Sequence, residues 1–325
     1  MKVLVAGGTG SVGLAIVEQL AAAGDEVVAL SATEPSRRIA AALTSMKGSI
    51  GIEIGDVRDS ERLRRILRAN EIDSVVNGAT ITPDAAAEVH RAEKIIDVNC
   101  VGSVALFNAF ADSCPGRFIQ LGSIAAYGSA ASSETLLKED AGQERPETLY
   151  EITKFASERA VLRLSALRKR EAVSLRLGDV FGRWEHRTSD RAVNSAPYQL
   201  MSLAQRGGEA VLPRPGAKHW VYSADIAQAV RCALRVEALA YHVANVSSPF
   251  RWSLVEWCEL LGRRFPAFSF RVDPQRATIA LFADNAPMAL ARIERIGYEA
   301  RFGLEASFHD YLEWTRAHPD FFAAA

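Results

Sequence analysis

The sequence predicts an α/β fold, with a doubly wound parallel Rossmann sheet followed by a smaller mixed α/β C-terminal substrate domain. Three observations predict it. Short apolar runs alternate with helical patterns through the first 180 residues, and a glycine-rich turn joins the first run to the first helix. After residue 182 the alternation loosens into clusters of Arg, Gly and Pro. Continuous apolar strands alternating with helices are typical of a parallel sheet covered on both faces, and right-handed crossovers wind such a sheet in both directions.

The first part of the chain supplies most of the expected elements. Strands are expected at 2–7, 26–31, 51–56, 74–79, 117–123 and 172–178, where β-branched and other apolar residues cluster. Helices are expected between them, at 11–23, 36–46, 59–69, 85–113 and 149–170. These segments form the expected dinucleotide-binding domain, residues 1–182.

The second part is expected to divide between two domains. A helix at 224–237 and a strand at 241–247 are assigned back to the first domain, so that residues 221–248 return to it. The substrate domain then comprises residues 183–220 and 249–325, with helices at 197–206, 252–265 and 306–318.

Composition restricts the classes of function. The chain has 325 residues and a net charge of −1, which gives no electrostatic reason to expect a nucleic-acid partner. We find no signal-peptide core and no stretch that approaches a membrane span, so we expect no membrane partner. The four cysteines form no C-x-x-C pair and have no histidine at metal-ligand spacing, which indicates free thiols, no metal and a cytoplasmic location.

The glycine-rich turn is the first candidate binding site. In GGTGSVG, Gly7 allows a tight turn, Gly10 allows the backbone to approach a pyrophosphate, and Gly13 allows the helix to pack on the strand. Ser11 and Val12 lie between them at the start of the helix, whose free N–H groups and dipole favour a phosphate. The motif predicts a dinucleotide site; the alternative is a tight turn without a ligand.

The tip of the second strand bears on the choice between NAD and NADP. An acidic residue there would bind the adenosine ribose of NAD, but Ser31 occupies the position and Arg37 and Arg38 follow. Guanidinium groups suit a 2′-phosphate, so we favour NADP over NAD; the alternative is that both arginines are a solvated helix start. Asp56, after the third strand, is placed to meet the adenine edge, and a helix N-cap is the competing role.

A Tyr-x-x-x-Lys pair and a serine are the catalytic candidates. Tyr150 and Lys154 lie one turn apart on a helix, and Ser123 ends the fifth strand, at the sheet edge where ligands bind. A free phenol has a pKa near about 10, and an adjacent ammonium together with an oxidised nicotinamide would lower it. Ser123 can then hold a substrate hydroxyl while Tyr150 exchanges its proton, and Lys154 can also hold the nicotinamide ribose. An exposed Tyr–Lys pair beside a strand-ending serine is the structural alternative.

Taken in the order in which they occur along the chain, the sequence motifs resemble those of the extended short-chain dehydrogenases/reductases. More narrowly, they resemble those of the NAD-dependent epimerase/dehydratase branch. The resemblance rests on GGTGSVG, GDV, NGAT, DVN, LGSIAAYG and YEITK. It implies catalytic roles for Ser123, Tyr150 and Lys154. It also implies that the remaining matched positions touch or frame the cofactor; these are Gly7, Gly10, Gly13, Ser31, Asp56, Val57, Ala79 and Asn99.

Departures from the family pattern narrow the expected reaction. Ile124 and Ala125 follow Ser123 where the dehydratases of the family have an Asp-Glu pair, so sugar dehydration is disfavoured. Gly178 and Asp179 are unusual beside the nicotinamide, and Arg276 is not followed by Gly-Asp, which weakens the expected grip on a nucleotide diphosphate.

The expected function is therefore hydride transfer to or from an NAD(P) cofactor, at a secondary alcohol or ketone of a sugar-like small molecule. The alternatives are a nucleotide-sugar epimerase and, in another class, a non-catalytic NADP-sensing regulator. The resemblance also implies a homodimer, paired through helices 88–113 and 149–170.

Overall fold

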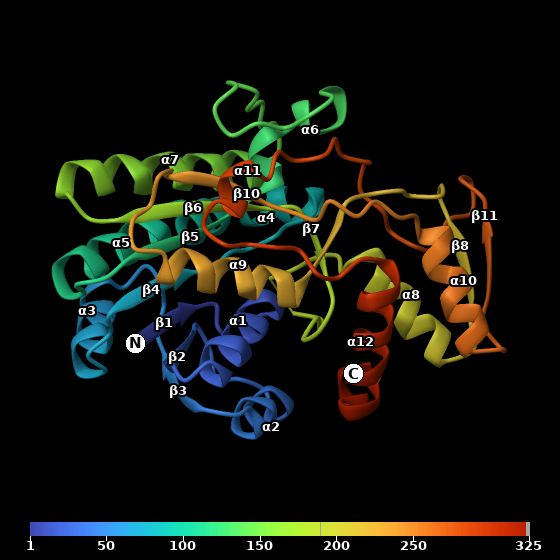
Figure 1. The fold of residues 1–325 in the computed structure, drawn as a ribbon, viewed down its shortest axis with the longest axis horizontal. Coiled ribbons are helices and arrows are strands. Elements are labelled where there is room, and N and C mark those ends of the chain that lie inside the picture. The colour runs from blue at the N-terminus through green and yellow to red at the C-terminus, as the bar shows by residue number, and fades with distance from the viewer. Residues whose placement is uncertain (189, 323–325) are drawn as a thin grey trace.

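The computed structural model describes residues 1–188 and 190–322. Its centre is a seven-stranded sheet in which every neighbouring pair is parallel, in the order β10-β6-β5-β4-β1-β2-β3 (Figure 1). The strands are β1 (Lys2–Ala6), β2 (Glu26–Ser31), β3 (Ser49–Ile54), β4 (Ser74–Asn77), β5 (Phe118–Ser123), β6 (Ala172–Leu177) and β10 (Val243–Val246). The predicted doubly wound fold is confirmed, and the direction of winding reverses between β1 and β4, which creates a crevice at their carboxyl ends.

Helices cover both faces of this sheet. One face carries α1 (Ser11–Ala22) and α9 (Ser223–Arg235), which pack against each other, with α2 (Arg37–Ser45) at its β3 end (Figure 1). The other face carries α3 (Ser60–Ala69), α4 (Ala85–Ile96), α5 (Gly102–Ser113) and α7 (Leu149–Arg168). Because both faces are covered, most side chains of the central strands are apolar and buried, and Val3, Leu4 and Val5 of β1 are fully buried.

The single helix expected over 85–113 is interrupted. Arg91 has non-helical torsion angles within α4, and a five-residue π-helix, Asp97–Val101, separates α4 from α5. By length and composition the segment Ala85–Ser113 could cross a membrane, contrary to our expectation that no stretch approaches a span. Half of its most apolar window is buried, and Leu106, Phe107 and Phe110 are wholly inside the protein, as in the core helix of a globular domain.

Most of the C-terminal region, residues 183–188, 190–220 and 249–322, lies beside one end of the sheet, while its short helix α11 (Ala291–Glu294) packs on the edge strand β10 (Figure 1). It also contains α8 (Ala196–Gln205), β8 (Glu209–Leu212), α10 (Leu254–Arg264), β11 (Ser269–Val272), α12 (Leu304–Ala317) and the 3-10 helix Pro319–Phe321. β8 pairs with β11, while the short strands β7 (Asp179–Phe181) and β9 (Trp220–Tyr222) pair with each other. The sequence predicted none of these four strands, because strands of three or four residues show too little alternation to be recognised.

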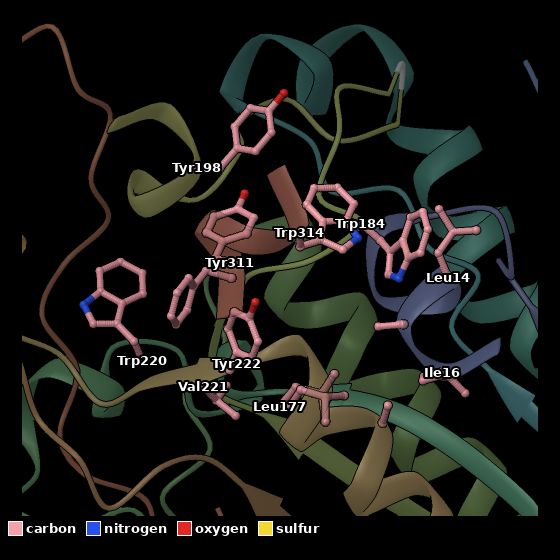
Figure 2. Close-up of a cluster of buried hydrophobic side chains, with 14 of the residues drawn as sticks. Leu14, Ile16, Leu177, Trp184, Tyr198, Trp220, Val221, Tyr222, Tyr311 and Trp314 are labelled. Carbon is pink, nitrogen blue, oxygen red and sulfur yellow. The ribbon is translucent and has the colours of Figure 1, made fainter. Parts of the chain in front are cut away.

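An aromatic cluster joins the C-terminal region to α1. Figure 2 shows Trp184, Tyr311 and Trp314 among buried side chains that also include Leu14 and Ile16 of α1. The Trp184 indole nitrogen also donates to the Glu18 carboxylate of α1, at 2.8 Å. The contact fixes the C-terminal region over the carboxyl ends of the strands.

Candidate active site

A cleft of about 1740 Å³ runs along the carboxyl ends of the strands. The glycine-rich turn lines one part of it, Ser123 and Tyr150 line another, and Lys218 and Asn285 approach from the C-terminal region. One continuous cavity therefore joins the predicted cofactor residues to the predicted catalytic residues.

The glycine turn has the geometry that a pyrophosphate requires. Gly7 has a φ of +72°, and a Cβ on Gly13 would lie 2.0 Å from the Gly7 carbonyl oxygen. Gly10 is the N-cap residue of α1 and has no side chain. The first backbone N–H groups of the helix, including those of Ser11 and Val12, therefore receive no hydrogen bond from an N-cap side chain. All of these residues line the cleft, and the residues present fit a dinucleotide phosphate here.

At the tip of β2 only part of the predicted set faces the cleft. Ser31 is buried, accepts from the Thr9 hydroxyl at 3.0 Å and donates to the Thr33 carbonyl at 2.7 Å. Arg38 lines the cleft, donates to the Asp320 carbonyl and lies 4.8 Å from the Phe321 ring centroid. Arg37 is exposed and is not among the lining residues.

Asp56 and Val57 both line the cleft beyond β3. The Arg58 guanidinium binds both carboxylate oxygens of Asp56 and holds the pKa of that carboxyl below its usual range. The N-cap of α3 is Asp59, whose carboxylate accepts from the Arg62 amide, so Asp56 does not have the competing capping role.

Ala79 lines the cleft at the end of β4, whereas Asn99 lies behind it. The buried Asn99 amide accepts from the Ile81 amide and donates to the Ile81 carbonyl and to the Thr153 hydroxyl. Asn99 sits in the π-helix, and it ties the loop after β4 to α7. It frames the site without being one of the lining residues.

The three catalytic candidates, Ser123, Tyr150 and Lys154, all line the cleft. Thr148 and Glu151 form a capping box at the start of α7, which fixes Tyr150 in its first turn. Burial raises the pKa of Tyr150, while hydrogen bonds with the Ser123 and Thr82 side chains act in the opposite direction. The phenol therefore lies beside the hydroxyl that ends β5.

The expected cause of an acidic phenol is not the one observed. The buried Lys154 ammonium donates to the Leu121 carbonyl at 2.5 Å, and burial lowers the pKa of Lys154 to about 8. The cation that lowers the pKa of Tyr150 is Arg191, and its effect is smaller than that of burial. In the chain without a cofactor, the phenol is thus less acidic than a free tyrosine, because desolvation disfavours its ionised form.

Thr82 and Arg191 were not predicted as site residues. The Thr82 amide donates to the Asp190 carbonyl at 2.7 Å, and the Ala192 amide donates to the Thr82 carbonyl at 3.1 Å. This pairing of two segments more than 100 residues apart brings Arg191 to Tyr150. No local sequence signal marks such a contact.

The comparisons with known proteins agree with this geometry. The family model described as "NAD dependent epimerase/dehydratase family" matches residues 3–247. The chain belongs to this family.

Curated relatives extend the match along the whole chain. The UDP-glucose 4-epimerase of Neisseria meningitidis serogroup C is 27% identical over 346 residues, covering 98% of both chains. The dTDP-6-deoxy-L-talose 4-dehydrogenase (NAD(P)(+)) of Kitasatospora kifunensis is 29% identical over 182 residues, covering 56% of this chain and 53% of the relative. The protein is thus an enzyme of the extended short-chain dehydrogenase/reductase type.

Solved structures share the fold. The UDP-glucose 4-epimerase of Thermotoga maritima with UDP-glucose matches with a TM-score of 0.80 and 18% identity, covering 98% of this chain and 99% of the other. The UDP-glucose 4-epimerase of Thermus thermophilus in complex with NAD gives a TM-score of 0.77 at 21% identity, covering 97% of this chain and 99% of the other.

Proposed function

We propose that the protein transfers hydride between NAD(P) and a carbon bearing a secondary hydroxyl in a sugar-like substrate, with Tyr150 as acid and base. The observation that carries this proposal is that Ser123, Thr82 and Tyr150 line one cleft together with the glycine turn, where the Ser123 and Thr82 side chains act to lower the pKa of the Tyr150 phenol.

The chain's own residues account for the proton and the orientation. The Ser123 hydroxyl would hold the substrate hydroxyl in line, and Tyr150, ionised beside a positively charged oxidised nicotinamide, would receive the substrate proton as the carbonyl forms. In the reverse direction the protonated phenol would donate that proton to the alkoxide. When bound, the nicotinamide supplies the hydride acceptor or donor. Lys154 is anchored to the Leu121 carbonyl at the end of β5, and so keeps α7 and Tyr150 in register with Ser123.

Substitution of Tyr150 tests this assignment. Tyr150→Phe should lower kcat by about 10²–10⁴-fold, because the proton-transfer group is lost, while the thermal stabilisation by NAD(P) is retained. Tyr241→Phe is the matched control, since Tyr241 is stacked on Arg292 outside the cleft and should leave kcat unchanged. Full activity of Tyr150→Phe on an alcohol that the wild type oxidises would refute the role.

A nucleotide-sugar 4-epimerase is the second candidate, and the curated relatives favour it. The two candidates differ in the fate of the cofactor. An epimerase releases no reduced cofactor, whereas a dehydrogenase accumulates it with one equivalent of ketone, which absorbance of the reduced nicotinamide measures. A regulator that only senses NADP is the third candidate, and a wild type that binds NADP but converts no alcohol or ketone would support it.

NADP is the proposed preference between the two nicotinamide cofactors. Two observations support it: Ser31 takes the place of an acidic residue, and Arg38 lies in the cleft wall beside it. Arg37 is exposed and is not a lining residue of the cleft, so it does not support this preference.

A homodimer through α4, α5 and α7 is also proposed. Exposed apolar side chains that a second copy of the chain would cover lie on α4 (Val89 and Ile96), on α7 (Ile152 and Leu167) and between α4 and α5 (Val101). Sedimentation of the wild type and of Val101→Glu tests it, because a charge on this face should favour the monomer. The free thiols of Cys100, Cys114, Cys232 and Cys258 support a cytoplasmic location.

A further inference from the structure

An ion pair between the buried Lys218 and the partly exposed Asp179 occupies the wall of the cleft next to Ser123, the proposed catalytic serine. Ser123 is paired in register with Leu177 at the ends of β5 and β6, and Asp179 follows two residues later in β7. Lys218 precedes β9, the partner strand of β7, and its Nζ lies 2.8 Å from the Asp179 carboxylate. Both residues line the cleft.

Neighbouring side chains hold both members of this ion pair in place. Lys218 is 1% exposed, and its ammonium lies 5.4 Å from the centroid of the Trp220 ring. The second oxygen of Asp179 accepts from the Asn285 amide at 2.9 Å. The indole N–H of the buried Trp220, which also lines the cleft, has no hydrogen-bond partner among the described residues.

The charge of this wall is therefore close to zero. A diphosphate placed against it would meet the Asp179 carboxylate and would compete with that carboxylate for the Lys218 ammonium. Arg191 does not replace Lys218, because its guanidinium lies 3.2 Å from the buried Glu185 carboxylate. Arg187 lines the cleft but is exposed and follows His186, whose amide donates to Ser11, so it belongs to the cofactor end.

The same groups suit hydroxyls. The Asp179 carboxylate accepts hydrogen bonds and the Asn285 side-chain amide both donates and accepts them, which matches the alternating donors and acceptors of a polyol. A neutral ligand also leaves this ion pair intact, whereas separating it would leave the Lys218 ammonium buried and unpaired.

We propose that the Asp179–Lys218 ion pair makes the enzyme selective for an uncharged, polyhydroxylated substrate and against substrates that place a diphosphate at this wall. This inference rests on the proposed function, and it deepens that function by naming the substrate class.

Neutralising one member of the pair tests it. Asp179→Asn keeps the shape of the side chain but leaves the Lys218 ammonium without its carboxylate. We expect isothermal titration of the wild type with UDP and with UDP-glucose to give no saturable binding below about 1 mM. Asp179→Asn should bind both at least about tenfold more tightly, the effect of one charge-assisted contact. The double variant Asp179→Asn, Lys218→Met should lose that gain, because the cation is gone.

The results that would overturn this inference differ from those that would refute the proposed function. Micromolar binding of UDP-glucose by the wild type, or an equal gain in the single and double variants, overturns the inference. Circular dichroism and the Tm establish that each variant is folded, and Asp179→Ser takes the place of an unfolded Asn variant. Because binding is measured without turnover, an inactive wild type in the Tyr150 assay would refute the proposed hydride transfer separately.

Discussion

Gly13→Ala is the substitution for which the structure gives the most definite expectation. A Cβ at this position would lie 2.0 Å from the Gly7 carbonyl oxygen, and 2.8 Å from the Gly7 carbonyl carbon and from the Gly8 Cα. All three are backbone atoms, so no flexible side chain can move aside. To reach an ordinary contact of about 3.4 Å, α1 and the turn must separate by roughly 1.4 Å.

Such a separation is opposed by the packing of α1. Leu14, Ile16 and Val17 of this helix are fully buried against the core, and α1 also packs on α9. Overpacking of a tight core typically costs about 1–3 kcal/mol. With an unfolding entropy of about 2.1 cal/mol/K per residue, this corresponds to a Tm lower by roughly 1.5–4.5 °C for 325 residues. The displaced amides at the start of α1 should also lose the pyrophosphate, so the thermal stabilisation by NAD(P) should disappear.

Two other glycines provide matched controls. A Cβ at Gly10 comes no closer than 3.3 Å to the Gly7 oxygen, so Gly10→Ala should keep a Tm near that of the wild type while weakening NAD(P) binding. Gly262 lies in α10 with nothing within 4 Å of its added Cβ, so Gly262→Ala should leave both quantities unchanged or raise the Tm slightly. Differential scanning fluorimetry with and without NAD(P) measures all three variants. An unchanged Tm and an unchanged cofactor shift for Gly13→Ala would refute the steric reasoning.

Two further predictions concern the cofactor preference and the pH dependence of stability. Arg38→Ala should raise the KM for NADP about tenfold or more and leave the KM for NAD within about twofold, because one charge-assisted contact to a 2′-phosphate is lost. Arg37→Ala is the control variant. Equal effects of Arg38→Ala on the KM values of both cofactors would contradict the assignment. Burial raises the pKa of Asp225 to about 6, so between about pH 4 and 6 the unfolded chain releases a proton that the folded chain retains, and the wild type loses stability as the pH rises. Asp225→Asn has no such proton, so its Tm relative to the wild type should increase across this window, by an amount equivalent to at most about 3 kcal/mol; a constant difference from pH 4 to 7 would contradict the raised pKa.

The sequence predicted the large sheet well because its signals are local. Most strands of the sheet are short, largely apolar segments close to their own crossover helices, and the glycine turn is contained in seven consecutive positions. The predicted strand at 241–247 was placed with the sheet, and β10 is indeed its seventh strand. The short pair of β7 and β9 was missed because its three-residue strands are stabilised by each other and by the aromatic cluster, not by their own pattern.

The candidate site likewise contains residues that local sequence signals identify and residues that only contacts between distant segments bring into place. Ser123 and Tyr150 were identifiable because one ends a strand and the other begins a helix, and their neighbourhood follows from the sheet topology. The environment of Lys154 was not identifiable, because its partner is a backbone carbonyl, which has no sequence signature. Thr82 and Arg191 depend on a pairing between distant loops, and Arg38 on the packing of Phe321 at the opposite end of the chain.

The placement of the Asp179–Lys218 pair explains how such a site can keep its chemistry while the choice of substrate changes. The reacting groups are fixed by β5 and α7, whose positions follow from the sheet and from the capping box of Thr148. The wall beyond β6 is instead carried by β7 and β9, two short strands that pair with each other outside the large sheet. A change of charge at Asp179 or Lys218 therefore alters what the cleft admits without moving Ser123 or Tyr150. Specificity in this protein is accordingly expected to respond to single substitutions in that wall, whereas substitutions around Tyr150 should alter kcat for every substrate alike.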